Sequence, residues 1–222
     1  MRKTEERQVF KNKILKILRL LKQEQITVAA PIIPIYNQAN FIGYLRVVSQ
    51  SAYDDRGEIR LLAKWRYASQ AWFPAQFTVT EEGTRDWVQK KLIDAEDRIL
   101  FFIETPSGKP IGHVGLFRFN FSEFACEIDN VIRGEAYLPG IMTSAIITLI
   151  NWAKKYLKVK NIYLEVFSDN SRALKLYQRC DFIEIKRVPL RKEEQDGRVS
   201  WIEDVGKKRN IQRYNVYMKY RK

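Results

Sequence analysis

The spacing of hydrophobic and polar positions predicts a chain in which strands and helices alternate. Apolar residues at every second position indicate half-buried strands, whereas apolar residues three and four apart indicate amphipathic helices. From residue 41 onward, the predicted order is a strand, two helices, three antiparallel strands, a helix, a strand, a helix and two strands. This order predicts an α+β fold, with a mixed but mostly antiparallel sheet and helices on both of its faces.

The N-terminal residues differ in pattern from the rest of the chain. Residues 5–23 place hydrophobic side chains on one broad face with basic side chains between them, which predicts an amphipathic helix. Pro31 and Pro34 follow and predict an extended linker, because proline cannot continue a helix. We therefore expect a leader at residues 1–40 and one domain at residues 41–222. The helix is expected to dock on the domain or to pair with a second copy in a homodimer, because large apolar faces usually cover a protein surface.

The segment at residues 161–182, NIYLEVFSDNSRALKLYQRCDF, predicts a strand, a polar turn and a short helix. Its first half alternates in period two, and Asn170 stands where a helix-capping side chain is expected. Glu165 is unusual because a carboxylate in an apolar strand is costly to bury unless it has a use. Tyr177 lies on the helix that follows. A carboxylate base and a phenolic acid at one cleft would suit proton transfer.

The composition adds a strong positive charge. The 222 residues carry a formal net charge of +13 at pH 7, spread over the N-terminal helix and the C-terminal third of the chain. Such a surface fits nucleic acid, or small ligands that carry phosphate groups. Nucleic acid is the less expected partner, because the sequence has no aromatic RNA-stacking motif.

Two further features concern the environment of the protein. No apolar run approaches the length that crosses a bilayer, and the N-terminus lacks the apolar core of a secretory signal. Cys126 and Cys180 have neither metal-ligand spacing nor the pattern of a disulfide framework. We therefore expect a cytoplasmic protein with reduced thiols, no membrane partner and no metal site.

A family resemblance rests on two separate motifs in the expected order. The run from Asn170 to Phe182 resembles the N-x-x-A-x-x-L-Y-x-x-x-G-F motif of the GNAT acyl-CoA N-acetyltransferases, with Asp181 in place of the glycine. Upstream, residues 133–134 (RG) and 138–143 (LPGIMT) before a long helix resemble the acetyl-CoA pyrophosphate loop, of which only the central glycine matches the usual pattern. The resemblance covers about residues 55–222 and implies acetyl-CoA as co-substrate.

The resemblance also implies which residues hold the cofactor. Amides at the start of a helix form a ready anion site, and a glycine there lets the backbone approach a phosphate closely. Residues 129–132 match the position where strands of the family bulge and bond the pantetheine arm. The residues assigned to cofactor binding are Val131, Gly140, Ile141, Met142, Thr143, Asn170 and Arg172.

For the chemistry, Glu165 is the expected base and Tyr177 the expected acid that protonates the departing thiolate. Glu127 and Asp129 on the neighbouring strand are rivals for the base, and so is His113, the only histidine, whose ordinary pKa suits that task. The residues assigned to the acceptor are Trp72, as part of an aromatic wall, Glu127 and His113.

The resemblance implies an N-acetyltransferase in which a primary amine attacks the thioester of acetyl-CoA directly. The branch pattern favours an amino-sugar nucleotide of surface-polysaccharide biosynthesis as acceptor. A ribosomal-protein-type N-terminal acetyltransferase is the alternative enzyme, and a non-catalytic basic CoA- or RNA-binding module is the alternative of another class. Residues 191–209, which include Trp201, are long enough to form a lid over the cleft.

Overall fold

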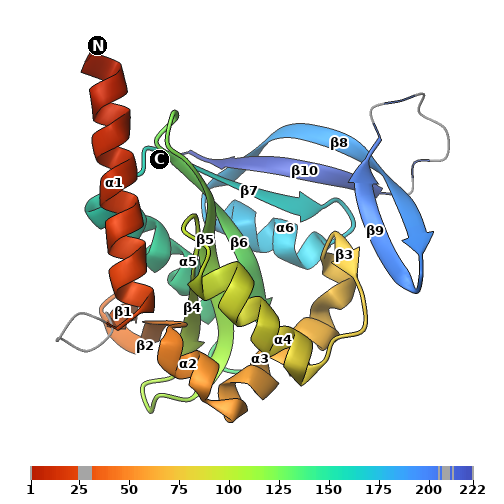
Figure 1. Ribbon diagram of the computed structural model, residues 1–222, viewed down its shortest axis with the longest axis horizontal. Helices are drawn as coiled ribbons and strands as arrows, with labels where there is room; N and C mark the ends of the chain where they lie inside the picture. Colours follow the sequence, from red (N-terminus) through yellow and green to blue (C-terminus); the bar gives the residue numbers. More distant parts are fainter. Residues whose placement is uncertain (1, 25–31, 205, 207–210, 212, 222) are drawn as a thin grey trace.

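The computed structural model describes residues 2–24, 32–204, 206, 211 and 213–221. It has one sheet between two groups of helices (Figure 1). The strands are β1 (Ile32–Asn37), β2 (Asn40–Val47), β3 (Ala75–Gln76), β4 (Ile99–Glu104), β5 (Pro110–Asn120), β6 (Ala125–Arg133), β7 (Asn161–Phe167), β8 (Phe182–Gln195), β9 (Arg198–Glu203) and β10 (Arg213–Tyr220). Their order across the sheet is β1-β2-β4-β5-β6-β7-β10-β8-β9-β3. Only β6 and β7 pair in parallel among these strands of the described chain, so the predicted mixed, mostly antiparallel sheet is confirmed.

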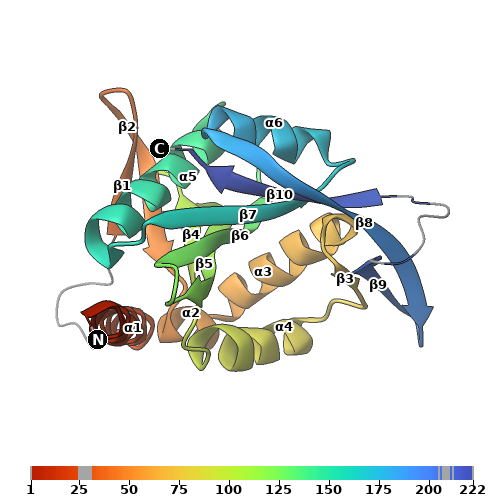
Figure 2. The same ribbon diagram turned by 90° about the horizontal axis from the view of Figure 1, so that it is seen from above.

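Helices cover both faces of the sheet, as the sequence predicts. The helical elements are α1 (Arg2–Lys22), α2 (Gln50–Asp54), α3 (Arg56–Ser69), the 3-10 turn η1 (Gln70–Trp72), α4 (Glu81–Trp87) with the π-helical turn η2 (Val88–Ile93), α5 (Ile141–Trp152) with the π-helical turn η3 (Ala153–Leu157), and α6 (Ser171–Arg179). Seen from above, α1 to α4 lie on one side of the sheet and α5 and α6 on the other (Figure 2). The helices of the described residues are too short or too polar to span a bilayer.

The period-two pattern of β4 explains how one strand serves two hydrophobic clusters. Successive side chains of a strand point to opposite faces of the sheet. Phe101 contacts Trp152 of α5 with ring centroids 5.5 Å apart, while the next residue, Phe102, lies 6.3 Å from Trp65 of α3. All four rings are buried, so β4 joins the two clusters that form the core.

Trp65 also fixes α3 against the end of β6. Its indole lies directly over Gly134, where a Cβ atom would overlap the ring. The indole is 1% exposed, so the ring has no room to retreat. This contact holds α3 beside the carboxyl end of β6.

The N-terminal helix docks on the rest of the molecule. Phe10, Ile14 and Leu18 are buried in the same cluster as the sheet residues, and the Phe10 ring lies 4.8 Å from that of Phe124 in the β5–β6 turn. Lys22 at the end of α1 donates hydrogen bonds to the carbonyls of Leu92 and Ala95 at the end of η2. This is the docking that the sequence predicted as one alternative. The division of the chain at residue 40 stays a prediction.

The expectation of an extended linker is wrong for residues 32–37. This segment is β1, which forms a hairpin with β2 and buries Ile35 completely. Pro34 is compatible with pairing because β1 is the edge strand of the sheet, where a missing N–H group is tolerated. Pro31 lies outside the described residues.

The segment after residue 190, whose length suggested a lid, forms paired strands where the structure describes it. Strand β8 continues to Gln195 and forms a hairpin with β9, turning at Asp196 and Gly197, whose φ angles are 49° and 72°. Two consecutive positive φ angles are typical of the tight turn that joins paired strands. Strand β9 in turn pairs with β3, so the hairpin is tied to the segment after α3. Trp201 therefore belongs to a regular strand.

The central strands β6 and β7 pair only over a short stretch. Ala125 to Glu127 face Asn161 to Tyr163, and beyond these residues the two strands have no paired positions. On its other side, β6 pairs with β5, but the register shifts between His113 and Gly115, which leaves an extra residue in β6 near Asn130. Asn130 has a φ of 49°, as expected of a bulge. The separation of the strands and the bulge both lie in the middle of the sheet.

Candidate active site

A cavity of about 910 Å³ lies where β6 and β7 separate. Its walls come from α3, the segment from η1 to α4, β5, β6, β7, β10, the first turn of α5, and α6. It brings together all the site residues that the sequence predicted except Glu127. The predicted residues that line it are Trp72, His113, Val131, Gly140, Ile141, Met142, Thr143, Glu165, Asn170, Arg172 and Tyr177.

The start of α5 has the form of an anion site. Gly140 is the N-cap residue with a φ of 86°, a conformation that favours glycine, and the space beside its Cα is open. The amides of Met142 and Thr143 have no acceptor among the described residues, so they are available to a ligand. The expectation for Ile141 is wrong in part, because its N–H group donates to the Leu138 carbonyl at 3.3 Å.

The bulge in β6 is held by a histidine. The Nδ1 atom of His113 lies 2.6 Å from the carbonyl oxygen of Asn130, and the imidazole is buried. The pKa of His113 is lowered to about 4, mainly by burial and to a smaller extent by the Arg66 guanidinium, while the bond to Asn130 acts in the opposite direction. The neutral ring is therefore a donor that fixes the bulge beside Val131, and a weak base at neutral pH.

Glu165 projects from β7 into the cavity. Asn215 of β10 donates a hydrogen bond from Nδ2 to its carboxylate at 2.7 Å. Burial raises the pKa of Glu165, and the nearby carboxylates of Glu127 and Asp129 raise it as well, against the effects of Asn215 and Arg118. A raised pKa makes a carboxylate a better proton acceptor at neutral pH.

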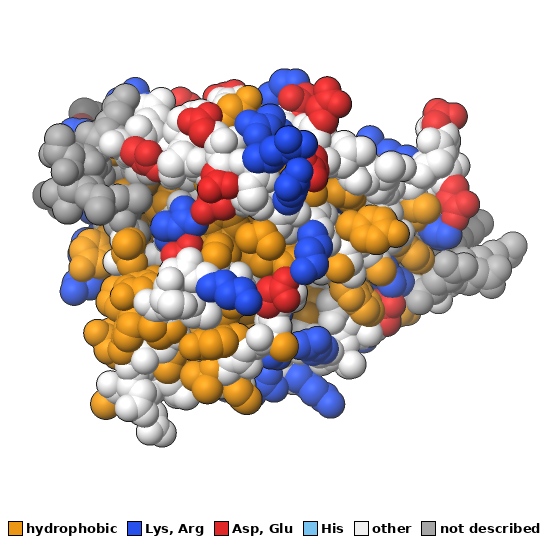
Figure 3. Space-filling view, turned by 90° about the horizontal axis from the view of Figure 1, so that it is seen from below, with side chains coloured by type: hydrophobic (Ala, Val, Ile, Leu, Met, Phe, Trp, Pro, Cys, Tyr) orange, Lys and Arg blue, Asp and Glu red, His pale blue; other side chains and the backbone are white. Residues whose placement is uncertain are grey.

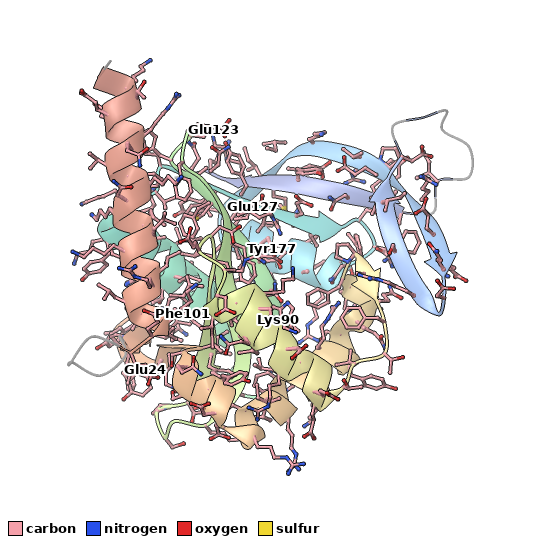
Figure 4. The ribbon with its side chains drawn as sticks, in the orientation of Figure 1. Glu24, Lys90, Phe101, Glu123, Glu127 and Tyr177 are labelled. Atoms are coloured by element: carbon pink, nitrogen blue, oxygen red, sulfur yellow. The ribbon has the colours of Figure 1, made fainter. Side chains whose placement is uncertain are left out.

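The two rival carboxylates are paired with Arg118 of β5. Its guanidinium lies 2.5 Å from Glu127 and 2.9 Å from Asp129. Among the described residues, Glu165 forms no ion pair, so it is the carboxylate of this group that is free to accept a proton. Glu127 is not part of the cavity wall. Figure 4 labels it on β6, with Tyr177 nearer the centre of the molecule.

Tyr177 places its side chain in the cavity wall from the last turn of α6. The ring is 7% exposed and lies 6.2 Å from that of Phe182. Burial raises the pKa of its hydroxyl above the ordinary value, so the group is protonated at neutral pH. In the described part of the chain the hydroxyl has no hydrogen-bond partner, which leaves its proton available.

The turn between β7 and α6 is built as the sequence predicts. The Asn170 side chain accepts a hydrogen bond from the Ala173 amide at 3.1 Å and caps α6. Arg172 is exposed at the rim of the cavity. Asp181, which stands where the motif has glycine, adopts a φ of 63°, so the backbone conformation of the motif is kept.

The sequence analysis missed several polar residues of the site, among them Arg66, Arg118 and Asn215. Arg66 of α3 and Asn215 of β10 line the cavity, and Arg118 pairs with the two acidic side chains beside it. Asn215 is 50 residues from Glu165 in sequence and reaches it through the pairing of β10 with β7. The alternating pattern of β10 does not by itself indicate that Asn215 faces the same side of the sheet as Glu165. That inference also requires knowing that β10 pairs with β7.

The comparisons with known proteins agree with this geometry. The family model for the GNAT acetyltransferase domain matches residues 44–183. A spermidine N(1)-acetyltransferase of Vibrio cholerae serotype O1 is 26% identical over 133 residues, which are 59% of this chain and 76% of that protein.

Solved structures share the fold at low sequence identity. A probable acetyltransferase from Chromobacterium violaceum has a TM-score of 0.61 at 18% identity, over 86% of this chain and 87% of that one. The spermidine N-acetyltransferase from Vibrio cholerae in complex with CoA and spermine has a TM-score of 0.55 at 18% identity, over 79% of this chain and 92% of that one.

The matched residues 44–183 contain the bulge, the glycine at the start of α5, and nearly all of the motif around Tyr177. They also make up more than half of the 222 residues. The free amides at α5 and the bulge in β6 fit a CoA pyrophosphate and its pantetheine arm. The chain belongs to the GNAT acetyltransferase family, and it is an enzyme that transfers an acetyl group from acetyl-CoA to an amine nitrogen.

Proposed function

We propose that Glu165 and Tyr177 carry the proton transfers of this reaction. An amine attacks a thioester only when it is neutral, so the acceptor ammonium must first lose a proton, which Glu165 takes directly or through water. The nitrogen then forms its bond to the acetyl carbon and gives up a second proton to water, and the bond to sulfur breaks. Tyr177 donates its proton to the departing thiolate. The raised pKa of Glu165 and the unpartnered hydroxyl of Tyr177 support these roles.

The same proposal assigns the residues that bind acetyl-CoA. The amides of Met142 and Thr143 would bind the pyrophosphate, and Gly140 would allow its close approach. Val131 in the bulge would face the pantetheine arm, and Arg172 at the rim would add positive charge near the phosphates. Asn170, which caps α6, would also lie beside the pantetheine arm of the cofactor.

The acceptor is proposed to be a small molecule. The main support for this proposal is the cavity, whose volume of about 910 Å³ lies within the range of small-molecule sites. The β8–β9 hairpin and β3 stand beside its acceptor end, where a peptide would need an open groove. Trp72 is 46% exposed and offers a flat ring to a sugar or a base. An amino-sugar nucleotide is therefore our first candidate.

A polyamine is the second candidate. The relatives from Vibrio cholerae are named as spermidine acetyltransferases. Glu127, Asp129 and Glu165 could attract a polycation to the sheet, although Arg118 already neutralises part of this charge.

A competition assay tests the acceptor class. The purified enzyme receives acetyl-CoA together with amino-sugar nucleotides, spermidine and peptides with free N-termini, and the products are separated by mass. We expect the highest kcat/KM for an amino-sugar nucleotide. Preferential acetylation of spermidine would establish the second candidate, and preferential acetylation of a peptide would contradict the small-molecule proposal.

A further inference from the structure

Arg66 is a cation on the acceptor side of the cavity that the reaction described above does not use. It lies near the end of α3, is half-buried, and forms part of the cavity wall. Its Nη2 atom donates to the carbonyl of Ala75 in β3 at 2.7 Å. The guanidinium carbon lies 3.6 Å from the centre of the Phe73 ring and 5.3 Å from that of Phe77. The side chain is therefore fixed in place on two sides.

The charge of Arg66 is not compensated within the protein. Its Nη1 atom is closed from solvent and has no hydrogen-bond partner. Within the described residues, no carboxylate lies within 4.0 Å of the guanidinium, whereas Arg46 in the same half of the molecule pairs with both Glu58 and Glu104. Burial lowers the pKa of Arg66 to about 10, against a smaller effect of Asp129. Burying a charge without a partner is costly, so an anion in the cavity would stabilise this charge by contacting the part of the guanidinium that lines the wall.

The surroundings of Arg66 are also basic and aromatic. Arg198 of β9 lies 5.9 Å from the Phe77 ring on the side of the β3 pairing. Arg213 of β10 lies 5.9 Å from the Trp72 ring, next in the chain to Phe73. Figure 3, a view from below, shows Lys and Arg side chains among exposed hydrophobic side chains. A planar guanidinium among aromatic rings suits a phosphate or carboxylate group that is attached to a flat or cyclic molecule.

We propose that Arg66 forms an anion-binding subsite in the acceptor end of the cavity, and that the natural acceptor carries a phosphate or carboxylate group close to its amine. This inference rests on the proposed function, because it places the amine at Glu165. The acceptor is then held at two ends, with its ammonium at the carboxylates of β6 and β7 and its anionic group at Arg66. A polyamine would bring a second ammonium toward Arg66, which like charge disfavours. The subsite is separate from the pyrophosphate seat at α5, because Arg66 is anchored to β3.

The test uses enzyme saturated with CoA, so that the pyrophosphate seat is occupied. Binding of inorganic phosphate, uridine diphosphate and malonate is measured by calorimetry in the wild type and in Arg66→Met. Arg60→Met is the matched control, because Arg60 lies on the same helix but is exposed and pairs with Glu81. We expect at least one anion to bind the wild type and the control equally, and to bind Arg66→Met about 10- to 100-fold more weakly. Arg66→Lys should recover part of the affinity.

The pattern of binding identifies the source of the anion. Tighter binding of uridine diphosphate than of phosphate would indicate a nucleotide-linked acceptor, and tighter binding of malonate would indicate a carboxylate. The inference is overturned if none of the three anions binds the CoA-saturated wild type, or if Arg66→Met keeps the wild-type affinity. Should Arg66→Met fail to fold, the anion affinities of the wild type and of Arg66→Lys still test the subsite. Anion binding that is weaker in Arg66→Lys than in the wild type would support it, and equal binding would overturn it.

A second readout separates this inference from the proposed function. Release of CoA from acetyl-CoA is followed with simple primary amines, and anion binding is measured on the same preparation. Amine acetylation without anion binding would overturn the subsite alone. Anion binding without acetylation of any amine would overturn the proposed roles in catalysis and leave the subsite standing.

Discussion

The two sides of the cavity are built in different ways. On the proposed cofactor side, the groups that would face the ligand are mostly backbone amides and the Asn170 cap, and they come from short, continuous segments before α5 and α6. On the acceptor side, the groups are side chains such as Arg66, Trp72 and Asn215, which come from α3, η1 and β10. Backbone groups serve one ligand that does not change, whereas side chains can be replaced one at a time. The difference explains how a family can keep its cofactor and vary its acceptor.

The largest effect is expected where the two sides meet, at Glu165. The change Glu165→Gln keeps the hydrogen-bonding shape but removes the base, so kcat should fall by about 100- to 10,000-fold. In the wild type, activity should fall as the pH falls through the raised pKa of Glu165, because the protonated carboxyl cannot accept a proton. The variant should lose this limb of the pH–rate profile.

Glu127→Gln is the matched control for this experiment, because Glu127 is paired with Arg118 and lies outside the cavity wall. Wild-type rates in Glu165→Gln, together with a large loss in Glu127→Gln, would show that the base has been assigned to the wrong strand.

A smaller loss is expected at the departing thiolate. The change Tyr177→Phe should lower kcat by about 100-fold, because it removes the proton donor and keeps the ring. The melting temperature should stay the same, since the hydroxyl makes no hydrogen bond within the described residues and the ring keeps its place beside Phe182. Steady-state kinetics and thermal unfolding measure the two effects. Equal activity of the variant and the wild type would leave Tyr177 with a packing role only.

The smallest effect should be confined to the cofactor side. Gly140→Val would force a branched side chain into a φ of 86° beside the pyrophosphate seat, so the KM for acetyl-CoA should rise by about tenfold. Gly108→Val is the control, because Gly108 has a φ of 81° and equally open space but lies in the β4–β5 turn. A similar rise in both variants would mean that backbone strain, and not the seat, causes the effect.

The sequence predicted the local structure of the proposed cofactor side well because its signals are local. The glycine at the start of α5, the cap at Asn170 and the turn at Asp181 each follow from a few neighbouring residues. The bulge near Val131 was predicted from the family resemblance and is present. The strands β4 to β7 and the helices between them were predicted from their periodicity for the same reason.

The features that the sequence did not predict depend on contacts between distant parts of the chain. Strand β3 is two residues long and exists because β9 pairs with it, so no pattern within residues 75–76 could indicate it. Strand β1 contains a proline and becomes a strand only at the edge of the sheet. The sequence around Arg66 gives no local sign of its burial, because that burial arises from contacts with Phe73, Phe77 and β3.

The contact between Trp65 and Gly134 has a consequence for how such enzymes can diverge. A side chain at position 134 would need the space of the indole, and a smaller residue at position 65 would leave that space empty. We therefore expect a change of either residue alone to lower the stability of the fold. Since this pair joins α3 to the end of β6, new acceptor preferences can arise by substitution along α3 while the position of the helix is preserved.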